Sequence, residues 1–293
     1  MLLKNKKPLV SVVMPVFNAG DFLVEAITSI LNQTYKNIEL IIVNDGSTDS
    51  SKAIISYFKK RDKRVRVITN KINVGVSKSA SLAISAAKGV FIARMDADDI
   101  ADVKRIEKQV EFLFKNKKVV AVGGQCDLID SEGIKIGEKH FPLKNNEIKN
   151  VIFSHVPLQQ PTLMVNMNLI PENFVWYDEN YSSAEELELL FKFFKFGEIA
   201  NLSETVLSYR MHSHNTSLIN PKKTFYLTLK TRIIAILKYG YTPSFGGIVA
   251  SVLQTIFVTL APSSVIYPTY SFLRGMKSVN MKNVKNNFSL AKV

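Results

Sequence analysis

Short runs of valine, isoleucine and leucine alternate with segments of helical spacing over the first hundred residues. The runs are nearly continuous in apolar residues, which is typical of parallel strands covered by helices on both faces. We predict strands at Leu9–Met14, Ile38–Val43, Val65–Ile68 and Val90–Met95. Helices are predicted between them at Asp21–Asn32, Ser50–Arg61 and Ser77–Ala87. This alternation predicts an α/β fold in which crossover helices join the strands.

The pattern is less regular after residue 100. It predicts a helix at Val103–Lys115 with Asp102 as its N-cap, and an apolar strand at Val119–Val122. Residues 134–175 are harder to interpret and are expected to mix short strands with loops and prolines. Helical spacing returns at Ser183–Phe196, followed by short strand-like pieces around Ile199 and Val206, and large aromatics such as Trp176 are expected to pack in the core.

Polar side chains gather where three of the predicted strands end. Pro15–Asn18 follow the first strand, Asn44–Ser47 follow the second, and Asp96–Asp99 follow the fourth. In open α/β sheets, ligands bind outside the carboxyl ends of the strands. The three clusters therefore predict a single ligand site at one edge of the sheet.

The chemistry of this site is narrowed by what the clusters contain. The first strand is followed neither by Gly-x-Gly-x-x-Gly nor by a Gly-Lys-Ser/Thr loop, which disfavours a dinucleotide dehydrogenase and a P-loop phosphotransferase. Asp96 and Asp98, two residues apart after a buried strand, suit a hard divalent cation shared with substrate phosphates. A solvated turn that caps helices is the alternative for so short a motif.

Six segments, in this order and spacing, resemble the motifs of family 2 glycosyltransferases, which have the GT-A fold. They are Ser11–Asn18, Val43–Asp49, Asn73–Ser77, Ala93–Asp99, Ser183–Leu189 and Leu207–Ser213. The resemblance covers residues 8 to about 217. It implies a Rossmann-like GT-A sheet, mixed but mostly parallel, with helices on both faces, in a catalytic domain at residues 1–220.

The resemblance also implies the ligands of the site and the residues that hold them. The donor would be a nucleotide-diphosphate sugar, with a UDP-sugar expected. Mn²⁺ or Mg²⁺ would bridge its diphosphate. Three roles are open for Asp99: a second metal ligand, a contact with the acceptor, or the N-cap of the next turn, which is the preferred one. Residues expected around the base and ribose are Pro15, Phe17, Asn18, Asp45 and Asp96. Those expected at the metal are Asp98 and His212, and a contact of His212 with the diphosphate is the alternative.

The candidate base for the acceptor hydroxyl is Glu186, because it aligns with the aspartate of a Glu-Asp pair in the resembling family. Glutamate and aspartate have similar ordinary pKa values, but the glutamate side chain is one methylene longer. The other interpretation of Glu185 and Glu186 is a solvated helix face. Arg210 is left open between a structural partner and a phosphate contact.

Composition supports a folded chain and shows an uneven distribution of charge. Hydrophobic residues make up 46% and charged residues 22%, which is usual for globular proteins. The single Cys126 cannot form an internal disulfide and no signal-peptide pattern begins the sequence, so we expect a cytoplasmic location. Residues 221–293 carry 10 basic residues and no acidic one, whereas all 25 acidic residues precede them.

The basic C-terminal part, residues 221–293, is predicted to be a helical tail that associates with a membrane. Phe225, Leu229, Ile233 and Leu237 form one helical stripe among lysines, and Phe245–Leu260 is mostly apolar. This second stretch is shorter than the roughly 20 residues of a membrane span, so we expect it to lie on the inner face of the cell membrane. Nucleic acid is disfavoured as a partner, because its binding surface would be basic and polar throughout. Packing on the catalytic domain, or on a second copy in a homodimer, is the remaining alternative.

Together these features predict an inverting, metal-dependent glycosyltransferase. It would pass a single sugar to a saccharide or lipid-linked saccharide acceptor, for surface polysaccharide synthesis, since no Gln-x-x-Arg-Trp motif of processive synthases is present. The alternatives are a catalytically silent nucleotide-sugar-binding module, a sugar nucleotidylyltransferase, and a membrane adaptor whose tail is the working part.

Overall fold

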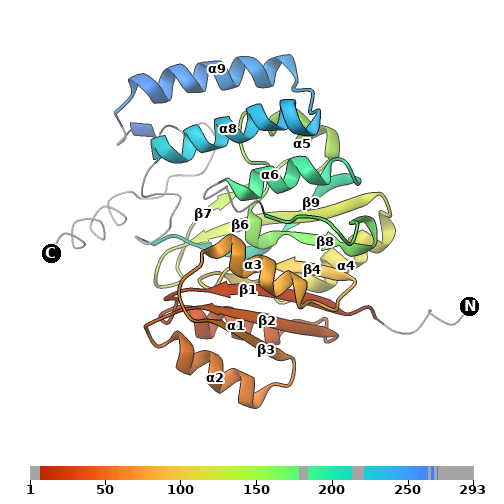
Figure 1. Cartoon of the computed structure of the whole chain (residues 1–293), viewed down its shortest axis with the longest axis vertical. Helices are drawn as coiled ribbons and strands as arrows, with labels where there is room; N and C mark the ends of the chain where they lie inside the picture. Colours follow the sequence, from red (N-terminus) through yellow and green to blue (C-terminus); the bar gives the residue numbers. More distant parts are fainter. Residues whose placement is uncertain (1–6, 178–183, 213–220, 263–264, 267–268, 270–293) are drawn as a thin grey trace, which may run out of the picture.

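The computed structural model describes residues 7–177, 184–212, 221–262, 265–266 and 269. Within these residues a nine-stranded sheet has the order β3-β2-β1-β4-β8-β6-β9-β5, with β7 paired to β6 (Figure 1). The strands are β1 (Val10–Val16), β2 (Ile38–Asp45), β3 (Val65–Asn70), β4 (Phe91–Arg94), β5 (Ile100–Ala101), β6 (Val119–Ile129), β7 (Lys135–Lys139), β8 (Met164–Asn166) and β9 (Glu198–Arg210).

Strand direction determines which ends of the strands meet at one edge. The pairs β1–β2, β2–β3 and β1–β4 are parallel. Because β8 is antiparallel to both β4 and β6, strand β6 runs in the same direction as β1, and β9 is parallel to β6. Only β5, β7 and β8 oppose this direction among the described strands. The predicted mixed, mostly parallel α/β sheet is confirmed.

Helices cover both faces of the sheet and divide the core into two layers. Alternate residues of β1 serve the two layers, since Val12 and Met14 pack with one set of helices and Val13 with the other. The first set is α1 (Leu23–Leu31), α2 (Ser51–Arg61) and α4 (Arg105–Lys115), and the second is α3 (Val76–Ser85), α5 (Asn145–Val151) and α6 (Glu185–Phe193). The four N-terminal strands and three helices predicted from the pattern are confirmed, with ends shifted by a few residues.

The middle of the chain contains more sheet than the sequence pattern predicts. Strand β9 has 13 residues and was expected as two short pieces, because polar residues around Ser203 interrupt its apolar pattern. Pairing with β6 carries it past that interruption through irregular register. The short strand β5 was not predicted, and β7 and β8 lie in the stretch where short strands were expected without bounds, since each is held by its neighbours in the sheet.

The predicted cap of α4 is wrong by two residues. The helix begins at Arg105 with Lys104 at the N-cap position, and the Asp102 carboxylate accepts a bond from the Lys104 amide at 3.0 Å. Asp102 therefore closes a turn ahead of the helix, a common alternative for this side chain. The predicted aromatic core is confirmed, because Trp176 packs edge-on against Phe174 and Phe193.

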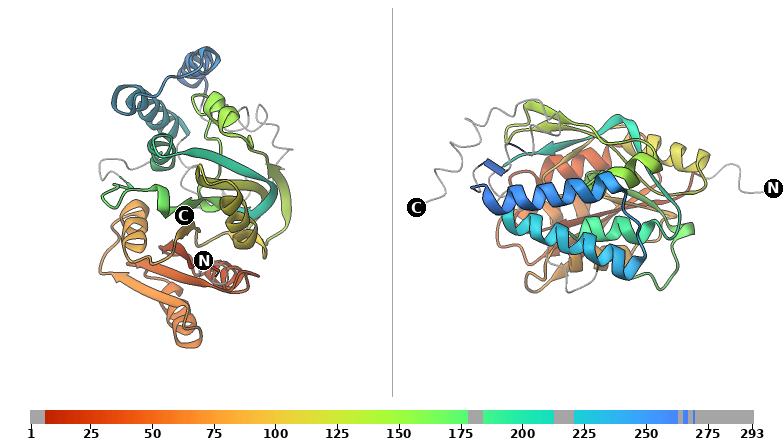
Figure 2. Two further views of the ribbon diagram at one scale, coloured as in Figure 1. Left: turned by 90° about the vertical axis from the view of Figure 1, so that its right-hand side faces the viewer. Right: turned by 90° about the horizontal axis from the view of Figure 1, so that it is seen from above.

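Two C-terminal helices, α8 (Pro221–Tyr239) and α9 (Phe245–Leu260), form an outer layer above α5 and α6 (Figures 1 and 2). Buried Glu188 of α6 accepts a hydrogen bond from the Tyr239 hydroxyl at the end of α8. No helix within the described residues is both long and apolar enough to cross a membrane. The predicted domain boundary at residue 220 and the lysines beyond residue 270 lie outside the described residues.

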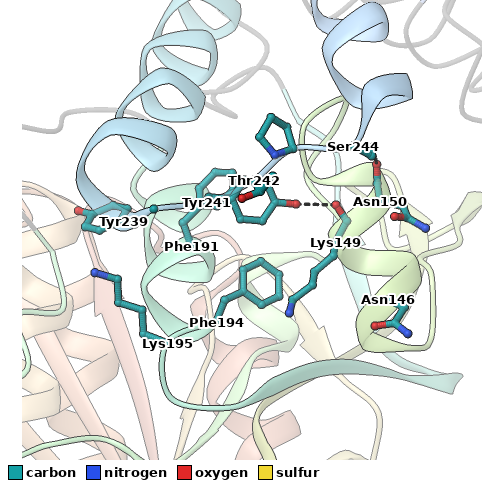
Figure 3. A pocket seen from close by; sticks show the side chains of 12 residues that line it. Asn146, Lys149, Asn150, Phe191, Phe194, Lys195, Tyr239, Tyr241, Thr242 and Ser244 are labelled. Carbon is teal, nitrogen blue, oxygen red and sulfur yellow. Dashed lines mark hydrogen bonds between the residues drawn. The ribbon is translucent and has the colours of Figure 1, made fainter.

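The turn between α8 and α9 sits over a hollow of about 570 Å³ above the ends of α5 and α6 (Figure 3). The Tyr241 ring contacts Phe191 and Phe194 there, and its hydroxyl donates to the Lys149 carbonyl at 2.6 Å. The lining includes none of the polar residues that follow β1, β2 and β4. This hollow is therefore the junction between the C-terminal helices and the sheet domain.

Candidate active site

The polar clusters predicted from the sequence flank the end of β1 at one edge of the sheet. Strand β1 lies between β2 and β4, with Val16 opposite Asn44 and Val13 opposite Arg94. Asp45 therefore ends the strand on one side of β1, and Asp96 follows the strand on the other. Strand β9 ends at the same edge, which brings His212 to the aspartates.

Three aspartates follow β4 as a compact group. One carboxylate oxygen from each of Asp96, Asp98 and Asp99 lies within 4.8 Å of the others. The Asp98 Oδ2 and His212 Nε2 atoms are 2.9 Å apart, so an imidazole from the end of β9 joins the group. Asp96 and Asp98 are partly exposed, whereas Asp99 is fully buried.

Asp99 has a different role from the helix cap that the sequence favours. Its Oδ1 accepts a bond from the Arg210 backbone amide at 2.9 Å, and its buried Oδ2 has no hydrogen-bond partner among the described residues. Burial raises the pKa of Asp99 well above its ordinary value, and the charges of Asp98 and Asp96 raise it further. A bound cation would offset this accumulation of negative charge.

The aspartate group has the donor set of a hard divalent cation. Carboxylate oxygens are the ligands that Mg²⁺ and Mn²⁺ prefer, and the unpartnered Asp99 oxygen points to an interaction still to be completed. Burial raises the pKa of Asp96 as well, with Asp98 and Glu185 adding to the effect and Arg94 opposing it. The residues present therefore fit a metal bound at Asp98 together with Asp96, Asp99 and His212.

The Arg210 guanidinium fixes the backbone beneath the aspartate group. Its Nε donates to the Asp98 carbonyl at 2.9 Å and its Nη1 to the Ser131 carbonyl at 2.9 Å. A third donor pairs with Glu25 of α1, and the guanidinium stacks on Phe22. Of the two interpretations that the sequence left open, the structural partner is the one that these contacts support.

Arg94 is a charged residue of the site that the sequence pattern did not single out. It is almost completely buried, and its Nη2 lies 3.3 Å from Asp96 Oδ1. Its position inside the apolar strand β4 hid it, because a strand residue shows its direction only once the sheet is formed. Phe22, at the N-cap of α1, was also missed, and its ring centroid lies 5.0 Å from that of His212.

Glu185 and Glu186 open helix α6, where the amino-terminal dipole favours a carboxylate. The preceding residue, Ala184, has a φ of 72°, a left-handed conformation that costs free energy in a residue other than glycine. Glu186 is half-buried, and burial together with the Glu185 and Asp96 charges raises its pKa to about 7. A carboxyl group with this pKa can both hold and release a proton near neutral pH.

The loops after β1 and β2 are tied together by Asn18. This residue has a φ of 48°, and its Oδ1 accepts a bond from the Thr48 amide at 2.9 Å. Gly46 has a φ of +72°, and an added Cβ would lie 2.7 Å from the Ile72 carbonyl carbon, so only glycine fits there. Beside this turn, Phe17 is exposed and Pro15 is buried at the end of β1.

Asp45 organises the loop that follows β3. Its Oδ1 accepts from Asn70 Nδ2 at 2.7 Å and from the Val74 amide at 3.0 Å, and its Oδ2 accepts from the Gly75 amide at 2.9 Å. These bonds use three of the about four acceptor sites of a carboxylate. The structure brings Pro15, Phe17, Asn18 and Asp45 to the predicted edge, and their contacts with a nucleotide stay a prediction.

Comparison with known proteins assigns a family to this arrangement. The family model described as glycosyl transferase family 2 matches residues 11–167, more than half of the chain. The chain belongs to this family. A glycosyltransferase of Haemophilus influenzae is 35% identical over 220 residues, covering 72% of this chain and 68% of the relative. A glycosyltransferase of Methanocaldococcus jannaschii is 34% identical, covering 77% of this chain and 79% of the relative. Both relatives are named as uncharacterized.

Solved structures of similar fold include two that contain a bound nucleotide sugar. Staphylococcus aureus TarS 1–349 in complex with UDP-GlcNAc has a TM-score of 0.62 and 19% identity, covering 78% of this chain and 66% of that one. A mannosyltransferase of Pyrobaculum calidifontis in complex with GDP-Man and Mn²⁺ has a TM-score of 0.59 and 13% identity, covering 93% and 82%. At these identities the likeness shows the fold, which is of GT-A type. The family 2 chain is therefore a glycosyltransferase built on that fold.

Proposed function

We propose that this glycosyltransferase is metal-dependent and inverting, and that it transfers a single sugar from a nucleotide-diphosphate sugar. A UDP-sugar is the expected donor, and a saccharide or lipid-linked saccharide of surface polysaccharide synthesis is the expected acceptor. The observation that carries the proposal is the aspartate group next to a carboxyl group of raised pKa. The negative charge that would bind the metal comes from Asp96, Asp98 and Asp99, and the base would be Glu186.

Each part of the donor has a candidate partner at the edge of the sheet. The base and ribose would lie over Phe17 and Asn18, with the remaining acceptor site of Asp45 available to a base N–H. Asp96 would face the ribose. Asp98, supported by Asp99 and His212, would hold Mn²⁺ or Mg²⁺, which offsets the charge that develops on the leaving diphosphate.

The reaction would be a single displacement at the anomeric carbon of the donor sugar. Glu186 accepts the proton of the acceptor hydroxyl while the hydroxyl oxygen forms its bond to that carbon. The bond from the anomeric carbon to the phosphate oxygen breaks, and its electron pair leaves with the nucleoside diphosphate. Attack from the side opposite the leaving group inverts the configuration.

The raised pKa of Glu186 favours an active base over a catalytically silent binding module. A solvated glutamate on a helix face would keep its ordinary pKa, whereas burial holds that of Glu186 near 7. The lack of a glycine-rich loop after β1 gives no support to a nucleotidylyltransferase.

Calorimetric titration tests the donor and the metal together. UDP is expected to bind wild-type protein with an affinity that Mn²⁺ increases about tenfold or more. GDP under the same conditions is expected to bind more weakly. Asp98→Asn is expected to abolish the increase due to Mn²⁺. Asp62→Asn, which removes a carboxylate paired with Arg64 ahead of β3, is the matched control. A UDP affinity of the wild-type protein that does not change with Mn²⁺ would contradict the proposal.

A further inference from the structure

Helix α9 presents a continuous apolar surface to the outside of the molecule. Its exposed large side chains recur at intervals of three and four residues, so they line one face of the helix. Helix α8, which runs beside α9 in the outer layer (Figure 2), also exposes large apolar side chains. The outer apolar face consists of Tyr226, Ile233, Leu237, Phe245, Ile248, Val249, Val252, Leu253, Ile256, Phe257 and Leu260.

The face of α9 that meets the protein carries small and polar residues together with one buried valine, Val258. Ser251 is buried and its hydroxyl donates to the Phe153 carbonyl, while Gln254 Nε2 donates to the Ser154 carbonyl at 2.9 Å. Ser244 caps the start of the helix and donates to the Asn150 carbonyl at 3.3 Å. A surface helix in water has the opposite arrangement, with its apolar stripe toward the core. The α9 sequence is therefore matched to an apolar neighbour on its outer side.

The charged side chains that α8 and α9 themselves carry are all positive. Lys223, Lys230 and Lys238 are exposed on α8, and the sequence contains no acidic residue after Glu204. Exposed apolar side chains with lysines beside them are the combination by which amphipathic helices bind anionic lipid surfaces.

We propose that the outer apolar face lies in the headgroup region of an anionic lipid bilayer, such as the inner leaflet of the cell membrane. Helix α9 has 16 residues, a length of about 24 Å at 1.5 Å per residue, against roughly 30 Å of hydrocarbon. Its inward polar groups are bonded to the loop after α5, so only the outer side meets lipid. The helix thus lies parallel to the membrane surface, and the proposal is independent of the chemistry proposed for the aspartate group.

Charge argues for lipid over the other partners that an apolar face can have. In a symmetric homodimer the same face meets itself, so the α8 lysines of one copy would approach those of the other with no acidic residue between them. A nucleic acid would set its phosphates against the apolar side chains of α9, which offer no hydrogen-bond donors. An anionic bilayer attracts the lysines by charge and takes up the apolar side chains at the same time.

Vesicle flotation of the full chain tests this placement. The protein is expected to float with phosphatidylcholine vesicles that contain about 30% phosphatidylglycerol and to stay unbound with phosphatidylcholine alone. The double change Leu253→Asp and Leu260→Asp is expected to weaken binding about 100-fold or more, because two exposed leucines lose their insertion. Tyr57→Asp, an exposed aromatic on α2 at the opposite end of the molecule, is the matched control and is expected to bind as wild type (Figure 1).

A charge reversal separates the contribution of the lysines from that of the apolar residues. Lys230→Glu is expected to weaken binding at low salt by about fivefold or more and to reduce its salt dependence. Equal binding to neutral and anionic vesicles would overturn the proposal, as would unchanged flotation of the leucine double variant. A concentration-dependent dimer in ultracentrifugation, lost in that variant and without vesicle binding, would assign the face to a second copy. UDP binding by these variants reports separately on the proposed function.

Discussion

At the carboxyl edge of the sheet carboxylates are drawn into the protein, whereas on the α8–α9 layer apolar side chains are turned out of it. Asp99 is fully buried with one oxygen unpartnered among the described residues, and Leu260 is 79% exposed. Each arrangement costs free energy in water. In our proposals the first region meets a cation with phosphates and the second meets lipid.

Helix α6 touches both regions, which makes their independence a question for experiment. Its first turn carries Glu185 and Glu186, and one turn later buried Glu188 pairs with Lys192 at 3.2 Å and accepts from Tyr239 of α8. If the two regions act separately, changes at the aspartate edge should alter turnover and metal binding only. Changes in the outer layer should alter lipid binding or stability only.

The largest expected effect is on turnover. Glu186→Gln keeps the size of the side chain but removes its ability to accept a proton, so transfer is expected to fall by about 10²–10⁴-fold. UDP binding in the calorimeter and vesicle flotation should stay as in wild type. Glu111→Gln on the exposed side of α4 is the matched control. Retained turnover in Glu186→Gln would remove this residue from the base position.

The pH of the assay should change the rate of transfer through the Glu186 side chain. With the pKa of Glu186 near 7, the carboxylate form that works as a base is lost as the pH falls. We expect kcat/KM to drop about tenfold per pH unit below 7, so that at pH 5 it is about 100-fold below its plateau. A rate profile that stays level down to pH 5 would mean that another group accepts the proton.

A smaller effect is expected from changing Arg210, which holds the backbone beside the aspartate group. Arg210→Lys keeps the positive charge, but an ammonium cannot reach the separate acceptors that the guanidinium fork bonds. Mn²⁺ affinity is expected to fall about 10–100-fold, measured by titration with the metal alone. Arg64→Lys, at a surface pair with Asp62, should leave it unchanged. Normal Mn²⁺ affinity in Arg210→Lys would show that these bonds do not position Asp98.

The smallest expected effect tests the inverted polarity of α9. Ser251→Ala removes the hydroxyl bonded to the Phe153 carbonyl and is expected to lower the free energy of unfolding by about 1 kcal/mol. Leu253→Ala, an outward change, is expected to stay within about 0.5 kcal/mol in the absence of lipid. Urea denaturation measures both. A larger loss for Leu253→Ala would indicate that the leucine packs against protein.

The spacing of apolar residues predicted strands and helices correctly where the local pattern and the tertiary packing agree. The continuous apolar runs of β1, β2 and β4 predicted strands because these strands are buried on both faces. The predicted strand β3 is present as well, only partly buried at the end of the sheet. The strand β9 was underestimated, since its polar middle is tolerated only through pairing with β6. The stripe Phe225 to Leu237 predicted amphipathicity of α8, but Ile233 and Leu237 face outward while Ala235 and Arg232 are buried.

The identity and order of the polar residues after the strands determined by themselves that this is a family 2 glycosyltransferase with carboxylates at one edge of a parallel sheet. That much follows locally, because strand direction and the residues after a strand are encoded together. Only the tertiary structure decided that Asp99 bonds β9 and that Arg210 holds the Asp98 backbone, contacts between residues more than a hundred positions apart. It also decided which side of α9 faces outward, since a helical stripe shows that a helix has two sides but not which one the protein covers.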